Sequence, residues 1–181
     1  TKKFGKQKWS EHVRAIDKMW EGIEKRIRAL KLPFKRTKIY QDGLPVCGKE
    51  QEIIRELAQK GSRNHKLVLW LMRRGAMMMG TEDPELLIRE YNHHKRIMEA
   101  KTNDERERFV HEFAEEAGEL LKKRDQKIRD RIVETLRPGE TGILFLGLLH
   151  HVDELLPSDM KVSYLIHRLP FRRSFEMQTT L

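Results

Sequence analysis

Ile-Leu-Phe-Leu-Gly-Leu-Leu at positions 143–149, followed directly by His150, is the stretch that decides the fold. Every residue of this run is apolar or glycine, so both faces of an extended segment would be apolar. That pattern is typical of a central strand in a parallel sheet whose two faces are covered by helices. We therefore predict a central strand over residues 143–149 that places His150 at its carboxyl end.

The segments on either side alternate between strand-like and helix-like patterns. Further strands are predicted over residues 37–41, 76–79 and 161–166. Helices are predicted over residues 9–30, 50–59, 64–74, 83–100, 102–136 and 152–156. Strands that alternate with helices, without hairpin signals between them, favour parallel pairing. The predicted fold class is therefore α/β, with a mostly parallel sheet of about four or more strands covered by helices and a long helix before the central strand.

Positive charge is concentrated in the first predicted helix. The whole chain has a net charge of +9, and residues 1–40 alone hold 13 Lys and Arg against four Asp and Glu. Apolar residues recur there at alternating four- and three-residue steps from Trp9 to Leu30, which indicates an amphipathic helix. We predict that residues 1–32 form a basic amphipathic helix packed on an α/β domain of residues 33–170. Residues 171–181 are predicted to be an irregular tail.

The composition excludes several classes of protein. Charged residues make up 36% and hydrophobic residues 38% of the chain, which favours a globular fold over a disordered one. No run reaches the ~20 apolar residues of a membrane span, and no secretory signal is visible at the start. The single cysteine, Cys47, excludes an internal disulfide and fits a reducing compartment. We expect a cytoplasmic protein with no membrane partner, and the sequence leaves a homo-oligomer open.

Polar side chains follow three of the predicted strands. Asp42 follows the strand at residues 37–41, Glu82 and Asp83 follow residues 76–79, and His150 follows residues 143–149. In an open parallel sheet, ligands bind outside the carboxyl ends of the strands, so these side chains predict a site at one shared edge. Asp83, which precedes a proline, is more simply a helix N-cap.

Two charged residues interrupt the apolar stripe of the long helix. Arg124 and Asp125 fall between apolar positions when the helix is projected at 100° per residue. A charge on a buried face is costly unless it is paired. One interpretation is a structural ion pair, either mutual or between helix and sheet. The other is that both side chains point into the same cleft as His150.

The chemistry of these residues is that of hydrolysis or of metal binding. His150 would act as a base or a metal ligand, because the pKa of an imidazole lies closest to neutrality. Glu82 or Asp42 would orient a water, and Arg124 would stabilise developing negative charge. His150, Glu82 and Asp42 could also supply the nitrogen and oxygen ligands of a divalent metal. The nucleophile elbow, the P-loop and the dinucleotide-binding glycine motif are absent from the sequence, which argues against those enzyme classes.

The chain also resembles a known superfamily over roughly residues 65–166. The residues that carry the resemblance are the glycine-flanked run 75–82, Arg124-Asp125, Ile128, Ile132, Pro138-Gly139 and the strand that ends in Gly147-Leu148-Leu149-His150. The pattern resembles the TraB/Tiki and erythromycin-esterase-like superfamily, which includes ChaN-type haem-binding proteins. The resemblance implies a site around Glu82, Arg124 and His150. It does not select a reaction, because members include metal-dependent peptidases, ester hydrolases and haem binders.

Three hypotheses of function follow from the sequence. The first is a hydrolase, metal-assisted in one form, whose catalytic residues are His150, Glu82, Arg124 and Asp125 and whose substrate is a small molecule or a peptide. The second is a binding module that has the cleft without the chemistry. The third is a protein that binds nucleic acid or another polyanion through the basic first helix.

Overall fold

The computed structural model describes residues 2–165 of the chain, without the side chains of residues 2–9, 11 and 12. The predicted irregular tail at residues 171–181 lies outside the described residues. Three parallel strands form the sheet, in the order β2-β1-β3. They are β1 (Thr37–Gln41), β2 (Met77–Met78) and β3 (Thr141–Phe145). The prediction of a mostly parallel sheet is confirmed, as are the bounds of β1.

The predicted position of residues 143–149 at the centre of the sheet is wrong. The central strand is β1, which pairs with β2 through Ile39 and Met78 and with β3 through Ile39 and Ile143. Its residues are almost all buried, because a strand pairs with each of its two edges and a layer of helices covers each of its two faces. By contrast, β3 ends at Phe145, and the chain then leaves the sheet, so the apolar run does not continue as a strand.

The prediction of four or more strands is also wrong for the described part of the chain. Residues 161–165, predicted as part of a strand, form no strand, and residue 166 lies outside the described residues. The alternation of apolar and polar residues there does not mark a buried face, because Val162 and Tyr164 are 41% and 61% exposed. Leu165 packs against the core instead, and its carbonyl accepts a hydrogen bond from Arg26.

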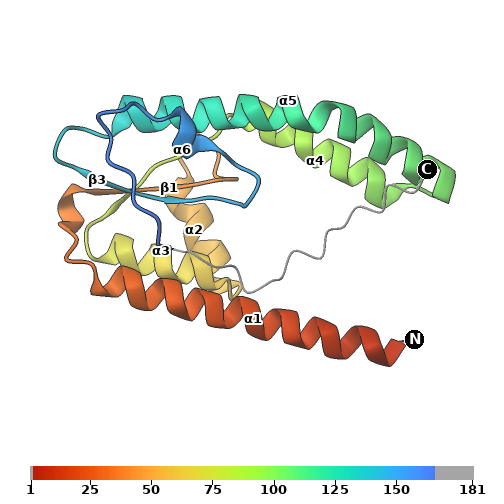
Figure 1. The fold of residues 1–181 in the computed structure, drawn as a ribbon, viewed down its shortest axis with the longest axis horizontal. Helices are drawn as coiled ribbons and strands as arrows, with labels where there is room; N and C mark the ends of the chain where they lie inside the picture. The colour runs from red at the N-terminus through yellow and green to blue at the C-terminus, as the bar shows by residue number, and fades with distance from the viewer. Residues whose placement is uncertain (1, 166–181) are drawn as a thin grey trace.

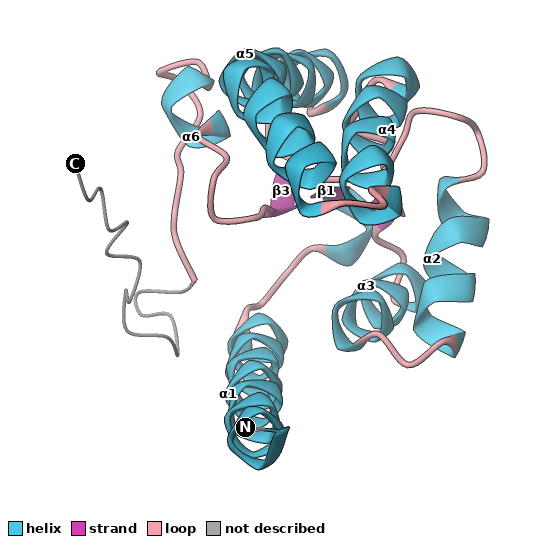
Figure 2. Cartoon of the chain, turned by 90° about the vertical axis from the view of Figure 1, so that its right-hand side faces the viewer, coloured by secondary structure: helices cyan, strands magenta, loops and turns pink. Residues whose placement is uncertain are grey.

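Helices cover both faces of the sheet (Figures 1 and 2). One layer holds α1 (Lys2–Ala29), α2 (Glu50–Gln59) and α3 (Arg63–Arg73), and the other holds α4 (Pro84–Glu99), α5 (Asn103–Thr135) and α6 (Val152–Leu155). A short 3-10 helix, η1 (Phe34–Arg36), precedes β1. Side chains from the two faces of β1 enter two separate cores. Ile39 packs with α1, α2 and α3, whereas Tyr40 packs with Ile128 and Ile132 of α5.

The amphipathic stripe of α1 is buried at one end only. Ile23 and Ile27 are 6% and 1% exposed and belong to the core, whereas Val13 and Ile16 are 42% and 39% exposed. The amino-terminal half of α1 extends past the body of the protein, in the same direction as the α4–α5 pair (Figure 1). Within residues 2–165, no helix has the length and apolar content that a bilayer crossing requires.

Two of the predicted helix starts are confirmed at atomic detail. Asp83 caps α4 by accepting the backbone N–H of Glu85 at 2.8 Å, with Pro84 in the first helical position. Thr102 caps α5 by accepting the N–H of Glu105 at 3.1 Å. Ser62 makes no cap bond to α3, because its hydroxyl contacts the imidazole of His65 at 2.6 Å.

Candidate functional site

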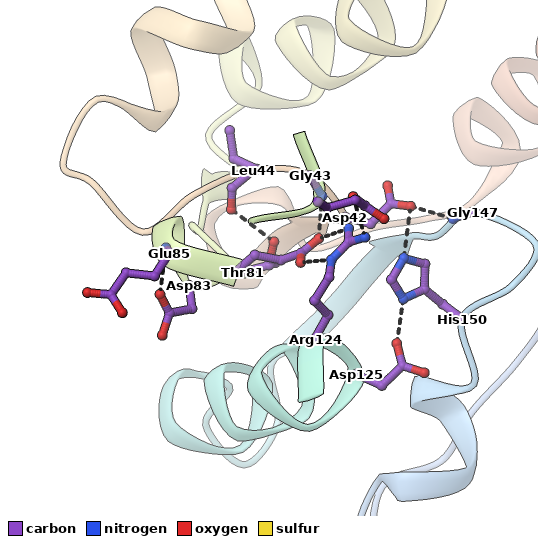
Figure 3. A network of polar contacts seen from close by, with 12 residues as sticks. Asp42, Gly43, Leu44, Thr81, Asp83, Glu85, Arg124, Asp125, Gly147 and His150 are labelled. Carbon is purple, nitrogen blue, oxygen red and sulfur yellow. Dashed lines mark hydrogen bonds and ion pairs between the residues drawn. The ribbon is translucent and has the colours of Figure 1, made fainter. Parts of the chain in front are cut away.

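The predicted site residues come together at the carboxyl edge of the sheet (Figure 3). Asp42 directly follows β1, Glu82 lies in the loop between β2 and α4, and His150 lies in the loop between β3 and α6. Arg124 and Asp125 reach the same edge from α5. The convergence follows from parallel pairing, because strands that run in one direction end on one side of the sheet.

The imidazole of His150 lies between two carboxylates. Its Nδ1 is hydrogen-bonded to Oδ1 of Asp125, and its Nε2 lies 3.6 Å from Oδ2 of Asp42. The side chains of His150 and Asp125 are 6% and 7% exposed, whereas that of Asp42 is 28% exposed. The three side chains therefore form a chain of ionisable groups that runs from the buried face of α5 to the surface.

Backbone N–H groups hold both carboxylates in place. The N–H of Gly147 donates to Oδ2 of Asp42 at 2.6 Å, and the N–H of His151 donates to Oδ2 of Asp125 at 2.9 Å. Both donors belong to the loop that carries His150, so this loop is fixed to β1 at one point and to α5 at another. Sequence reasoning missed these contacts, because a backbone donor leaves no mark on residue type.

The protein environment alters the acidity of the Asp42 carboxyl. Burial raises the pKa of its carboxyl above the ordinary value of 3.8, because removal from water penalises the charged form. The hydrogen bond from Gly147 and the nearby imidazole of His150 act in the opposite direction, to a smaller extent. A carboxylate with a raised pKa is a stronger base than one in water, which suits proton transfer.

Glu82 and Arg124 form a buried ion pair beside this group. The Nε and Nη2 atoms of Arg124 donate to the two carboxylate oxygens of Glu82 at 2.5 and 2.8 Å. Oε1 of Glu82 also accepts the N–H of Gly43 at 2.5 Å, and Nη1 of Arg124 donates to Glu90 at 2.8 Å. The hydrogen bonds that Arg124 donates to Glu82 are the main reason that the pKa of Arg124 is raised. This is the helix–sheet ion pair that the sequence offered as one interpretation of Arg124.

The predicted metal ligands do not form a set. His150 and Asp42 are neighbours, but the oxygens of Glu82 face Arg124 and the N–H of Gly43. Within the described part of the chain, no group of three or more His, Cys, Asp or Glu residues is placed to hold a metal ion. The residues present therefore do not fit the predicted metal centre of His150, Glu82 and Asp42, because a guanidinium already neutralises the third ligand.

Sequence reasoning also missed Glu90, the second acid on Arg124. Glu90 lies on α4, whose sequence carries several similar acids, so its spacing gave no signal of a buried partner.

Comparison of the chain with protein-family models, with curated proteins and with solved structures gives no significant match. The resemblance to the TraB/Tiki and erythromycin-esterase-like superfamily therefore stays a prediction.

Proposed function

We propose that Asp42, His150 and Asp125 form an acid–base site that hydrolyses a small-molecule ester. The observation that carries this proposal is the position of the His150 imidazole between a buried carboxylate and a half-buried one. An acid that fixes one ring nitrogen leaves the other to exchange a proton with a substrate. The partial exposure of Asp42 gives that second nitrogen a neighbour that water and substrate can reach.

The proposed reaction uses Asp42 as the base and His150 as the acid. Nε2 of His150 and Oδ2 of Asp42 are 3.6 Å apart, slightly too far for a direct hydrogen bond, so one water can contact both atoms. Asp42 takes a proton from this water as the oxygen of the water attacks the ester carbonyl. His150 enters this step with a proton on each ring nitrogen, the one on Nδ1 donated to Asp125. Its Nε2–H then protonates the departing alcohol as the carbon–oxygen bond breaks, which leaves a neutral ring with a free Nε2. Transfer of the proton from Asp42 to His150 restores both groups.

Asp125 and the Glu82–Arg124 pair act as positioning residues in this proposal. Asp125 holds Nδ1 of His150 and the N–H of His151, so it fixes both the ring and the chain that carries it. Glu82 holds the N–H of Gly43, the residue after Asp42, and Arg124 holds Glu82. Arg124 therefore stabilises the loop after β1, and its guanidinium, already bound by two acids, is not assigned to substrate charge.

Replacement of the proposed acid and the proposed base, with the adjacent His151 as the control, tests the proposal. We expect His150→Gln and Asp42→Asn to lower kcat/KM for nitrophenyl acetate by about 10²–10⁴-fold. His151→Gln is the matched control, because its side chain is 69% exposed and only its backbone N–H touches the site. Circular dichroism and thermal melting establish that each variant is folded. Ligand binding without any turnover in the parent protein would support the binding module instead, and equal activity in all variants would refute the site.

A second candidate function, polyanion binding by α1, is favoured by the exposure of its cations. Arg14, Lys18 and Lys25 are exposed on a helix that extends past the body of the protein. Stacking of bases on Trp20 is not part of this proposal, because its ring packs near Phe145 with the centroids 6.2 Å apart. The side chain of Trp9 lies outside the described residues. The exposed cations by themselves favour contacts with phosphate groups.

Salt-dependent binding of duplex DNA tests this second function. We expect the triple replacement of Arg14, Lys18 and Lys25 by Gln to weaken binding and to reduce the slope of log K against log salt. The reduction should be about 0.9 for each phosphate that the variant leaves without a cation. The matched control replaces the exposed Lys122, Lys123 and Lys127 of α5 by Gln. Equal affinity of the two triple variants would show that α1 is not the binding surface.

A further inference from the structure

Two leucines beside His150 lie on the surface. Leu148 and Leu149 are 67% and 73% exposed, although they end the same apolar run that buries Ile143 to 7%. They occupy the two central positions of a turn in which the N–H of His150 donates to the carbonyl of Gly147 at 3.3 Å. Turns usually carry glycine, proline, asparagine, aspartate or serine at such positions, so a pair of leucines is unexpected.

The contacts of the site fix the chain on both sides of the leucines. The N–H of Gly147, before the pair, is bonded to Asp42, and the ring of His150, after the pair, is bonded to Asp125. The two residues are therefore held between anchors that also position the proposed base and acid. Burial of a leucine side chain is favourable, and both leucines forgo most of that gain in their exposed positions.

We propose that Leu148 and Leu149 bind an aliphatic acyl chain of the ester substrate, next to the bond that is hydrolysed. This inference rests on the proposed hydrolytic function and specifies its substrate class. The leucines lie one and two residues before the proposed acid, in the turn that joins Gly147 to His150.

A second copy of the chain is the weaker choice of occupant. A stable interface buries about 800 Å² on each partner, and two leucine side chains provide only a small part of that. A short aliphatic chain needs no larger surface, and each methylene that leaves water on binding adds to the affinity. The size of the exposed pair thus favours a substrate group over a protein partner.

Turnover of a matched pair of esters tests the inference. We expect the Leu148→Gln/Leu149→Gln double variant to lower kcat/KM for nitrophenyl hexanoate roughly tenfold, with nitrophenyl acetate changed less than about twofold. The control is Ile88→Gln/Met98→Gln on α4, where the two side chains are 57% and 68% exposed. This control should leave both rates unchanged. An unaltered preference for hexanoate in the leucine double variant would overturn the inference.

A binding experiment separates this inference from the proposed function. The chain with labelled leucine methyl groups is titrated with 1-hexanol and, in parallel, with ethanol, while the methyl and imidazole signals are followed by NMR. We expect 1-hexanol alone to shift the signals of Leu148, Leu149 and the His150 ring. If 1-hexanol shifts these signals but the protein hydrolyses no ester, the proposed hydrolase is refuted and the binding of aliphatic chains by Leu148 and Leu149 stands. Absence of the shift, or conversion of a dimer to a monomer by the double variant, would overturn the inference.

Discussion

Nδ1 of His150 is hydrogen-bonded to Oδ1 of Asp125, which joins the loop after β3 to the middle of α5. Oδ2 of the same carboxylate accepts the N–H of His151 at 2.9 Å. One buried acid therefore orients the imidazole and fixes the backbone next to it. This double contact makes Asp125 the residue whose replacement most directly tests the geometry of the site.

Replacement of Asp125 by Asn should reduce hydrolysis and keep the fold. The amide can accept one of the two hydrogen bonds, but it carries no charge to balance a protonated imidazole. We expect kcat to fall about 10²-fold or more, with KM changed little, since Asp125 does not touch substrate. NMR of the ring nitrogens should show a changed tautomer. Asp130→Asn, at an exposed position of α5 with 56% of its side chain accessible, is the control and should leave both readouts unaltered.

Disruption of the Glu82–Arg124 pair should destabilise the protein strongly. Arg124→Met leaves the fully buried carboxylate of Glu82 without its cation, and we expect the free energy of unfolding to fall by about 3–5 kcal/mol. The double variant Glu82→Leu/Arg124→Met should recover part of that loss, because it leaves only the partly exposed carboxylate of Glu90 without a cation. Urea denaturation measures both. Arg89→Met, which breaks the exposed pair with Glu116, should cost less than about 1 kcal/mol. Equal losses in the two single variants would contradict the structural role of Arg124.

The raised pKa of Asp42 predicts a pH dependence of stability with a definite sign. The native carboxyl binds its proton more tightly than the unfolded one, whose pKa is near 3.8. The contribution of Asp42 to native stability is therefore lost as the pH rises from below 3.8 through the raised pKa, and this contribution changes no further above that point. Asp42→Asn lacks this titration, so its stability relative to the parent protein should improve over the same interval. Urea denaturation across this range measures the difference, and a constant difference would contradict the raised pKa.

The same titration should appear in catalysis. Asp42 acts as the proposed base only when it is deprotonated, so kcat/KM should increase as the pH rises through the raised pKa. NMR titration of the Asp42 carboxyl carbon gives the pKa independently of any substrate. A rate profile whose acidic limb does not coincide with that pKa would assign the base to another group.

Two isoleucines of α1 should differ sharply in their effect on stability. Ile27 is 1% exposed in the core, and Ile27→Ala should lower the free energy of unfolding by about 2–5 kcal/mol. Ile16 is 39% exposed on the projecting half of the same helix, and Ile16→Ala should change it by less than about 1 kcal/mol. Thermal and urea denaturation of both variants check the difference. A similar loss in the two variants would indicate that the projecting half of α1 is covered in solution.

Residue pattern alone predicted much of the fold and part of the candidate site. The strand at residues 37–41 and the cap of α4 at Asp83 appear as predicted, because strand preference and capping act over a few neighbouring residues. The meeting of Asp42 and His150 followed from parallel pairing alone. The sequence did not predict the partners of Arg124 and Asp42. Glu90 and the N–H of Gly147 belong to segments whose position in space cannot be inferred from the residue pattern.

The sequence by itself determined that strands and helices alternate and that polar side chains follow the strands. Both features depend on the residue types within short segments of the chain. Only the tertiary structure decided that β1 lies at the centre, that Arg124 is bound by Glu82, and that Leu148 and Leu149 lie on the surface. An apolar run in the sequence indicates only that burial of its side chains would be favourable. Whether the run is buried depends on which distant segments pack against it, and here the hydrogen bonds of Gly147 and His150 turn the chain outward before the run ends.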